Sequence, residues 1–155
     1  MGNILEYFQG KLYRKETIEK WNLPIKVQEK LNIEENKYYF LTISPEEERH
    51  GHENHIHLCL YPTKSEPVYL IEVETPVILP ELLHKCLELI KENTKNIITT
   101  TGFCKSKELC YFGIFFSILD PNEVNLDELI ADIKKVEKVN DANIFKYTCE
   151  GSGEA

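Results

Sequence analysis

Apolar and polar residues alternate along two short stretches in the first half of this chain, and both stretches predict strands. In residues 55–62, HIHLCLYP, the apolar residues Ile56, Leu58 and Leu60 alternate with histidine, cysteine and tyrosine. This is the pattern of a strand with one buried face. Residues 38–44, YYFLTIS, are rich in aromatic and β-branched side chains, which favour a second strand.

The residues that precede these two strands predict a strand and a short helix. Residues 12–18, LYRKETI, could begin as a strand. Pro24 suits the first turn of a helix, where its missing N–H costs nothing. Val27 and Leu31 lie four positions apart on one helical face, and the helix should end near Asn32.

The second half shows strand and helix periods in turn. Strands are predicted at residues 69–75, 96–102, 109–119 and 142–148. One helical stripe consists of Leu82, Leu83, Cys86, Leu87 and Ile90. Asn125 caps a second helix, with Glu128 in the capping-box position. The order β-α-β-β-α-β predicts a ferredoxin-like domain, a four-stranded antiparallel sheet with two helices on one face.

A break between the two halves falls at residues 62–67, PTKSEP, which favour a turn or linker. The chain has 155 residues, of which 42% are hydrophobic, and this suffices for one domain or two small ones. We therefore predict an α+β protein with a β-rich module at residues 11–62 and a ferredoxin-like domain at residues 67–149.

The second half resembles an ACT domain. The resemblance rests on the apolar first strand, on the turn ETPVILPELL, where that family has a Pro-Gly-x-Leu turn, and on KNII, where it has Asn-Ile at the start of strand two. It implies paired sheets and a small effector, such as an amino acid, at the interface. The implied effector contacts are Thr75, Pro76, Val77, Ile78, Leu79, Asn96 and Ile97. Val77 replaces the family's turn glycine, and valine hinders close approach to the backbone. The domain could therefore only dimerise, or hold its ligand elsewhere.

The first half resembles the AbrB-type swapped-hairpin module, on the stretch LPIKVQEKLNIEEN followed by KYYFLTI. The loop ETIEKWN lacks the glycines and arginines common in DNA-binding members. The resemblance implies interleaved hairpins of two chains and a basic surface toward DNA. The implied DNA contacts are Arg14, Lys15, Lys20 and Lys26.

The charge distribution restricts where a nucleic acid could bind. The net charge is −8, which disfavours non-specific binding to phosphate. Residues 1–31 carry six basic and four acidic side chains, +2 in all, which leaves −10 for the rest. Only the first part could face DNA, and a fold kept for dimerisation alone explains the same residues.

Four of the five histidines fall in residues 50–57, HGHENHIH, which raises the question of a metal site. On a strand, His55 and His57 lie about 6.6 Å apart on one face and could share one ion. His50 or His52 would have to complete the site, because Cys59 is about 13 Å from His55. Imidazole ligands suit Zn²⁺ or Ni²⁺. An exposed histidine-rich loop that binds metal only adventitiously is the alternative.

The five cysteines, Cys59, Cys86, Cys104, Cys110 and Cys149, form no CxxC pair or disulfide framework. We expect a reducing cytoplasm, with Cys104 and Cys110 as possible cross-strand neighbours. No uncharged apolar run approaches about 18 residues, so we expect no membrane partner.

Three functions remain open. We favour a non-enzymatic, dimeric regulator of transcription in which a small effector shifts the geometry of the N-terminal dimer. The alternatives are a metal sensor that uses the histidines and a purely structural dimerisation module.

Overall fold

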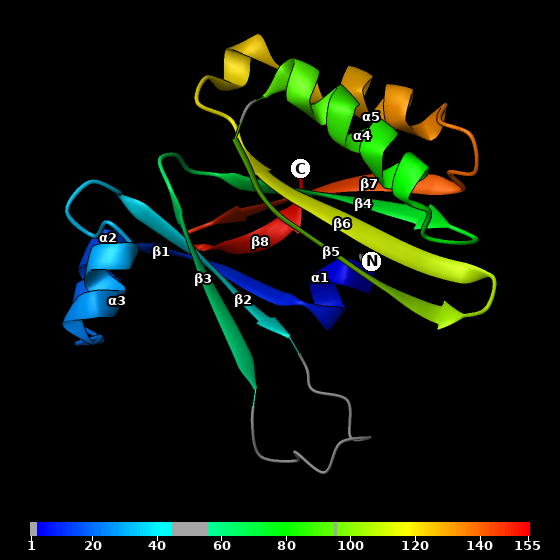
Figure 1. Cartoon of the computed structure of the whole chain (residues 1–155). Coiled ribbons are helices and arrows are strands. Elements are labelled where there is room, and N and C mark those ends of the chain that lie inside the picture. Colours follow the sequence, from blue (N-terminus) through cyan, green and yellow to red (C-terminus); the bar gives the residue numbers. More distant parts are fainter. Residues whose placement is uncertain (1–2, 45–55, 95) are drawn as a thin grey trace.

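The computed structural model describes residues 3–44, 56–94 and 96–155. The second half forms a five-stranded antiparallel sheet with two helices on one face (Figure 1). Its elements are β4 (Val68–Thr75), α4 (Pro80–Asn93), β5 (Asn96–Ser106), β6 (Leu109–Ser117), α5 (Leu126–Lys134), β7 (Asp141–Thr148) and β8 (Gly151–Glu154). The strand order is β5-β6-β4-β7-β8. Helices and antiparallel sheets in one chain confirm the predicted α+β class.

The helices α4 and α5 are held on the sheet by an apolar core. Leu82, Cys86 and Ile90 of α4 are buried, as their helical spacing predicts. On α5, Leu129 and Ile133 are buried in the same core. The Asn125 side chain accepts a hydrogen bond from the Glu128 N–H at 3.2 Å and so caps α5, which confirms that part of the capping box.

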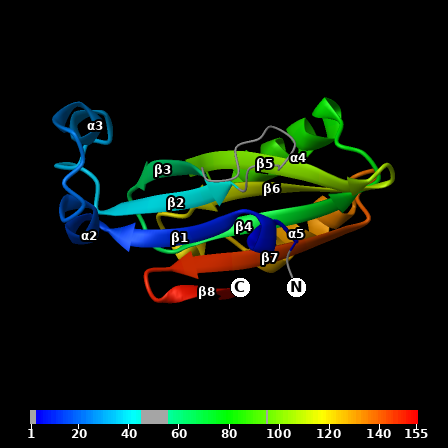
Figure 2. The same ribbon diagram turned by 90° about the horizontal axis from the view of Figure 1, so that it is seen from below.

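The first half forms a three-stranded antiparallel sheet in the order β1-β2-β3. Its elements are α1 (Asn3–Tyr7), β1 (Gln9–Arg14), α2 (Lys15–Glu19), α3 (Ile25–Lys30), β2 (Tyr38–Ser44) and β3 (His57–Thr63). This sheet lies against the face of the larger sheet that α4 and α5 leave uncovered (Figures 1 and 2). The described part of the chain therefore has three layers: helices, the five-stranded sheet and the three-stranded sheet.

Aromatic residues fill the space between the two sheets. Phe40 of β2 is fully buried, and its ring centroid lies 5.2 Å from that of Phe115 and 5.0 Å from that of Tyr147. The sheets approach closely because glycine lies at two contact points. A Cβ atom at Gly10 of β1 would stand 2.9 Å from Tyr147 of β7, and one at Gly113 of β6 would stand 2.9 Å from Ile4 of α1.

Residues 12–18 begin as a strand, as predicted, and continue as a helix. β1 ends at Arg14, which lies opposite Tyr38, the first residue of β2. The described residues just before Tyr38 form no strand that could pair with the chain after Arg14, and Lys15–Glu19 forms α2 instead. Ile18 of this helix is buried against Tyr39 and so covers the outer face of the sheet. The predicted helix after Pro24 is confirmed as α3, and Asn32 follows it with a positive φ of 47°.

Strand β3 forms where it was predicted, but only part of its predicted apolar face is covered. Ile56 and Leu58 are 60% and 58% exposed, although they belong to the apolar set. Tyr61, from the polar set, packs against the core between the sheets. Leu60, from the apolar set, is half-buried against the cluster of Ile18, Ile33 and Tyr39. Both faces of β3 are therefore exposed at its start, and both are partly covered further along.

The hydroxyl of Tyr147 is buried and has no hydrogen-bond partner among the described residues. Burial, and next the charge of Glu72, raises the pKa of this phenol above its usual value. Tyr39 differs, because its hydroxyl donates a hydrogen bond to the Leu31 carbonyl at 3.2 Å.

Because the Tyr147 hydroxyl has no partner and the Tyr39 hydroxyl is hydrogen-bonded, removing each should have opposite effects on stability. We expect Tyr147→Phe to raise the free energy of unfolding by about 1 kcal/mol, because it removes an unpaired buried hydroxyl. We expect Tyr39→Phe to lower it by about 1 kcal/mol, because it removes a hydrogen bond. Urea denaturation measures both, and an equal loss of stability in the two variants would contradict the prediction.

Candidate functional site

The turn between β4 and α4 contains five of the predicted effector contacts, Thr75 to Leu79. Thr75 is fully buried, and its hydroxyl donates a hydrogen bond to the Val77 carbonyl at 2.9 Å. The Thr75 hydroxyl therefore stabilises the turn from inside. Val77 is 42% exposed and is the most prominent apolar side chain that this turn offers to a ligand or a second chain.

The other two predicted contacts, Asn96 and Ile97, lie at the opposite end of the sheet. Thr75 pairs with Cys110 at the start of β6, whereas Asn96 pairs with Ser117 at its end. β4 and β5 flank β6 and run parallel to each other. Seven strand residues, about 23 Å, separate these two ends. One chain therefore does not bring the two parts of the predicted site together.

Asn96 and Ile97 line a hollow of about 340 Å³. The other lining residues are Asn36, Tyr61, Pro62, Thr63, Lys64, Ile98 and Ser117. The hollow lies where the end of β3 meets the start of β5, so both halves of the chain contribute to it. Its volume is at the lower end of the range of about 300–1,000 Å³ that is typical of small-molecule sites.

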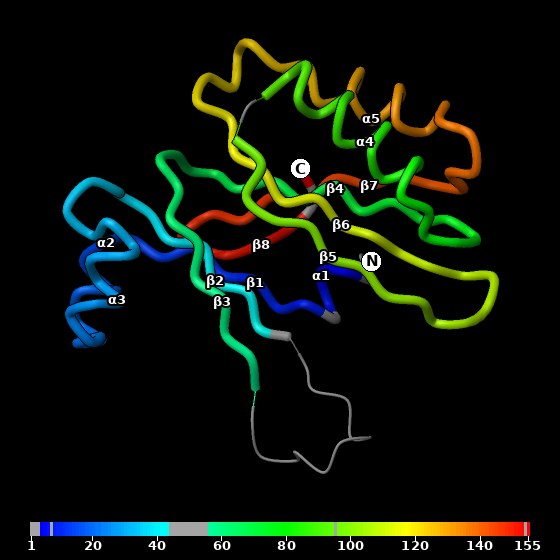
Figure 3. The backbone as a smooth tube through the Cα atoms, in the orientation of Figure 1, coloured from blue at the N-terminus to red at the C-terminus, as the bar shows by residue number. Residues whose placement is uncertain are grey.

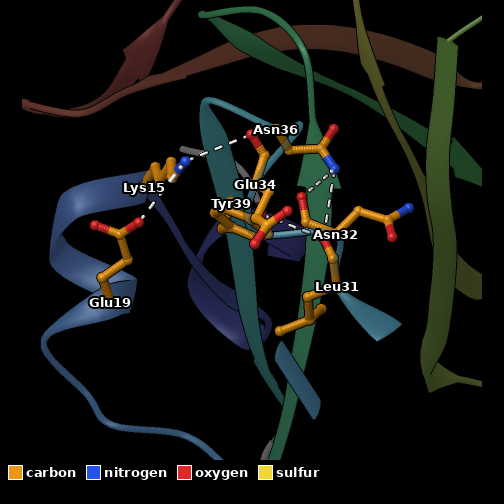
Figure 4. A network of polar contacts seen from close by, with 7 residues as sticks. All are labelled: Lys15, Glu19, Leu31, Asn32, Glu34, Asn36 and Tyr39. Atoms are coloured by element: carbon orange, nitrogen blue, oxygen red, sulfur yellow. Dashed lines mark hydrogen bonds and ion pairs between the residues drawn. The ribbon is translucent and has the colours of Figure 1, made fainter. Parts of the chain in front are cut away.

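Hydrogen bonds hold the polar residues of this hollow in place. The Thr94 hydroxyl donates to the Ser117 carbonyl at 2.7 Å and accepts from the Asn96 N–H at 3.3 Å. The Asn36 amide donates to the carbonyls of Leu31 and Asn32 at 3.3 and 3.2 Å (Figure 4). These bonds fix the Asn36 side chain and the backbone of Asn96 before any ligand arrives.

The hollow has the chemistry of a site for a small anion. Its lining includes Lys64, which carries an ammonium group, and Asn96, which carries an amide. The described residues that line the hollow include no histidine and no carboxylate. Ile97, Ile98 and Pro62 supply apolar surface. The arrangement can bind and orient a small carboxylate-bearing molecule.

The predicted DNA contacts lie on β1 and on the two small helices α2 and α3, which project at one end of the molecule (Figure 1). Lys15 lies 3.7 Å from Glu19, and its Nζ donates to the Glu34 carbonyl at 3.5 Å (Figure 4). Arg14, Lys20 and Lys26 are all exposed, and Lys20 directly follows the last residue of α2. Residues 15–37 contain five basic and five acidic side chains, so this projection has no net charge.

Three of the predicted metal ligands, His50, His52 and His55, lie outside the described residues. His57 is exposed at the start of β3. In residues 3–44, 56–94 and 96–155, no three side chains of histidine, cysteine, aspartate or glutamate are close enough to hold one ion. The metal site therefore stays a prediction.

Cys104 and Cys110 lie directly opposite each other on β5 and β6, which confirms that they are cross-strand neighbours. Their sulfur atoms form a disulfide, which we did not expect. Cys59, Cys86 and Cys149 are free thiols. Burial raises the pKa of the Cys86 thiol to about 11, so this cysteine is unreactive at neutral pH.

No model of a known protein family matches the chain, and no curated protein is similar enough to count as a relative. Among the described residues, no helix has both the length and the apolar character needed to cross a membrane.

Proposed function

We propose that this protein is a non-enzymatic, dimeric regulatory protein that binds a small carboxylate-bearing effector beside strand β5. The observation that carries the proposal is the hollow of about 340 Å³ at the start of β5, with Lys64 and Asn96 in its lining. An amino acid is one member of this ligand class. Control of transcription is the output that the two family resemblances suggest.

The strand order supports a ferredoxin-like, ACT-type second half. β4, α4, β5, β6, α5 and β7 follow one another as β-α-β-β-α-β. Within the sheet, β7-β4-β6-β5 is the order of that fold, and β8 is an addition at the edge. The first half would then be a supporting layer as well as the possible DNA-binding part, because its sheet covers the face of the larger sheet opposite α4 and α5.

Dimerisation through β5 would complete the site. β5 is an edge strand of 11 residues, and in the described part of the chain it pairs with β6 alone. An exposed edge of this length can pair with the same strand of a second chain. Antiparallel pairing brings the far end of one β5 to the start of the other. The Val77 turn of one copy would therefore approach the hollow at Asn96 of the second copy.

The Val77 turn is placed suitably for this arrangement. The Ile78 side chain contacts Gly102 of β5, where a Cβ atom would stand only 3.0 Å from its Cδ1. The turn thus packs against β5, the strand that forms the edge of the proposed dimer. An effector bound between the turn and the hollow would contact both chains, and its binding would favour the paired state.

Ligand binding tests the proposal. We expect at least one of the twenty standard amino acids or their 2-oxo acids, each at about 10 mM, to raise the melting temperature, since a ligand bound to the native state stabilises it. Lys64→Ala should weaken binding of that compound about tenfold or more in isothermal titration, because a charge-assisted hydrogen bond is lost.

The control for this experiment is Lys85→Ala, since Lys85 is an exposed lysine on α4 that does not line the hollow. It should bind the compound as the wild type does. The absence of any stabilising compound in the panel would contradict the proposal. Equal affinity in the Lys64→Ala variant would move the site away from the hollow.

A further inference from the structure

The disulfide between Cys104 and Cys110 lies where β5 and β6 approach their hairpin turn, at the right of Figure 3. Cys104 is exposed, whereas only 2% of Cys110 is exposed. The four residues after Cys104, Lys105 to Glu108, are all exposed. An attacking thiol can therefore reach the Cys104 sulfur from solvent, while the Cys110 sulfur is covered.

The disulfide belongs to a row of residues that crosses three strands. Cys104 of β5 lies opposite Cys110 of β6, and Cys110 in turn lies opposite Thr75 of β4. Thr75 begins the turn that carries Val77, and it holds that turn through the hydrogen bond to the Val77 carbonyl. The disulfide thus joins β5, the edge strand of the proposed dimer, to β6, and β6 pairs at Cys110 with the end of β4, which leads into the proposed effector turn.

We propose that Cys104–Cys110 is a redox-sensitive site, at which thiol–disulfide exchange with a dithiol reductant controls the pairing of β5 with a second copy. This inference rests on the proposed function, because it concerns the regulation of the same dimer edge. A disulfide in a protein of a reducing compartment, which the sequence led us to expect, is commonly transient and regulatory.

The exchange takes place in two steps. A thiolate of the dithiol attacks the Cys104 sulfur, the Cys104–Cys110 bond breaks, and Cys110 leaves as a thiolate that takes up a proton. The second thiol of the reductant then attacks the mixed disulfide and releases Cys104 as a thiol. The protein gains two electrons and two protons, and the dithiol becomes a disulfide. A small-molecule disulfide oxidant reverses both steps.

The bond affects the dimer edge through the order of β5. While it is closed, the last part of β5 cannot separate from β6, and the edge is already extended when a second copy arrives. Once it is open, the end of β5 must be ordered during association, and this weakens binding. The oxidised protein is therefore the form that dimerises more tightly.

Exchange itself is measured on the full chain by mass spectrometry after alkylation with iodoacetamide. We expect two additional labels, on Cys104 and Cys110, after treatment with dithiothreitol, and their loss again after oxidised glutathione. Labels on both residues before any reductant, in protein kept under air, would overturn the inference. Cys59→Ser is the control, because Cys59 is the exposed free cysteine, and it should leave the exchange unchanged.

Association is measured by sedimentation velocity on the oxidised protein, the reduced protein and the Cys104→Ser/Cys110→Ser double variant. We expect a dimer Kd at least about fivefold higher for the last two than for the oxidised protein, a modest coupling between sites. Dimers of equal Kd in all three would overturn this inference and leave the proposed function standing. Monomers in all three would overturn both.

Discussion

Replacing Phe40 by alanine is expected to lower the free energy of unfolding by about 3–5 kcal/mol, the usual cost of removing a buried phenylalanine side chain. Phe40 is fully buried and lies 5.2 Å from Phe115 and 5.0 Å from Tyr147 between ring centroids. It comes from the three-stranded sheet, whereas both neighbours come from the five-stranded sheet. The variant therefore removes a contact that joins the two halves of the chain.

Urea denaturation followed by circular dichroism measures this loss. Ile25→Ala is the matched control, because Ile25 is 73% exposed on α3, and its truncation should change stability by no more than about 0.5 kcal/mol. Two separate unfolding transitions in the wild type, with Phe40→Ala affecting neither by more than about 1 kcal/mol, would show that the sheets do not share a core.

A charge in the middle of β5 is expected to have the second large effect. Thr100 is exposed near the centre of this edge strand. In an antiparallel pair of β5 strands, Thr100→Lys would bring two ammonium groups together, and Thr100→Glu would bring two carboxylates together. Like charges across an interface cost several kcal/mol, so the dimer Kd should rise about a hundredfold in each variant. Thr100→Ser, which adds no charge, should dimerise as the wild type does.

Hydrophobic spacing predicted most elements of the second half, because its strands and helices each bury a regular set of residues. The predicted stripe of Leu82, Cys86 and Ile90 is buried in α4. β5 continues to Ser106, past the expected end at residue 102, because its pairing with β6 extends to Leu109. β8 was not predicted, since the sequence GSGE has no apolar pattern and is a strand only by pairing with β7.

The first half and the candidate site depend on contacts between distant segments, which spacing cannot show. Leu58, at the start of β3, is exposed, whereas Leu60 and Tyr61 further along pack against two different clusters. Asn36 and Lys64 line the hollow with Asn96 only because the end of β3 lies beside the start of β5. The sequence did single out Asn96 and Ile97, through the resemblance to an ACT domain. It could not show that Val77 lies at the other end of the sheet.

Mixing the two charged variants shows directly whether β5 pairs with β5 of a second copy. Thr100→Lys and Thr100→Glu proteins are combined in equal amounts, and the mass of the complex is measured by sedimentation velocity. We predict that each variant alone is largely monomeric and that the mixture recovers the dimer, because a lysine then faces a glutamate. A wild type that is monomeric at tens of micromolar, or single variants that dimerise as tightly as the wild type, would show that β5 does not form this pair.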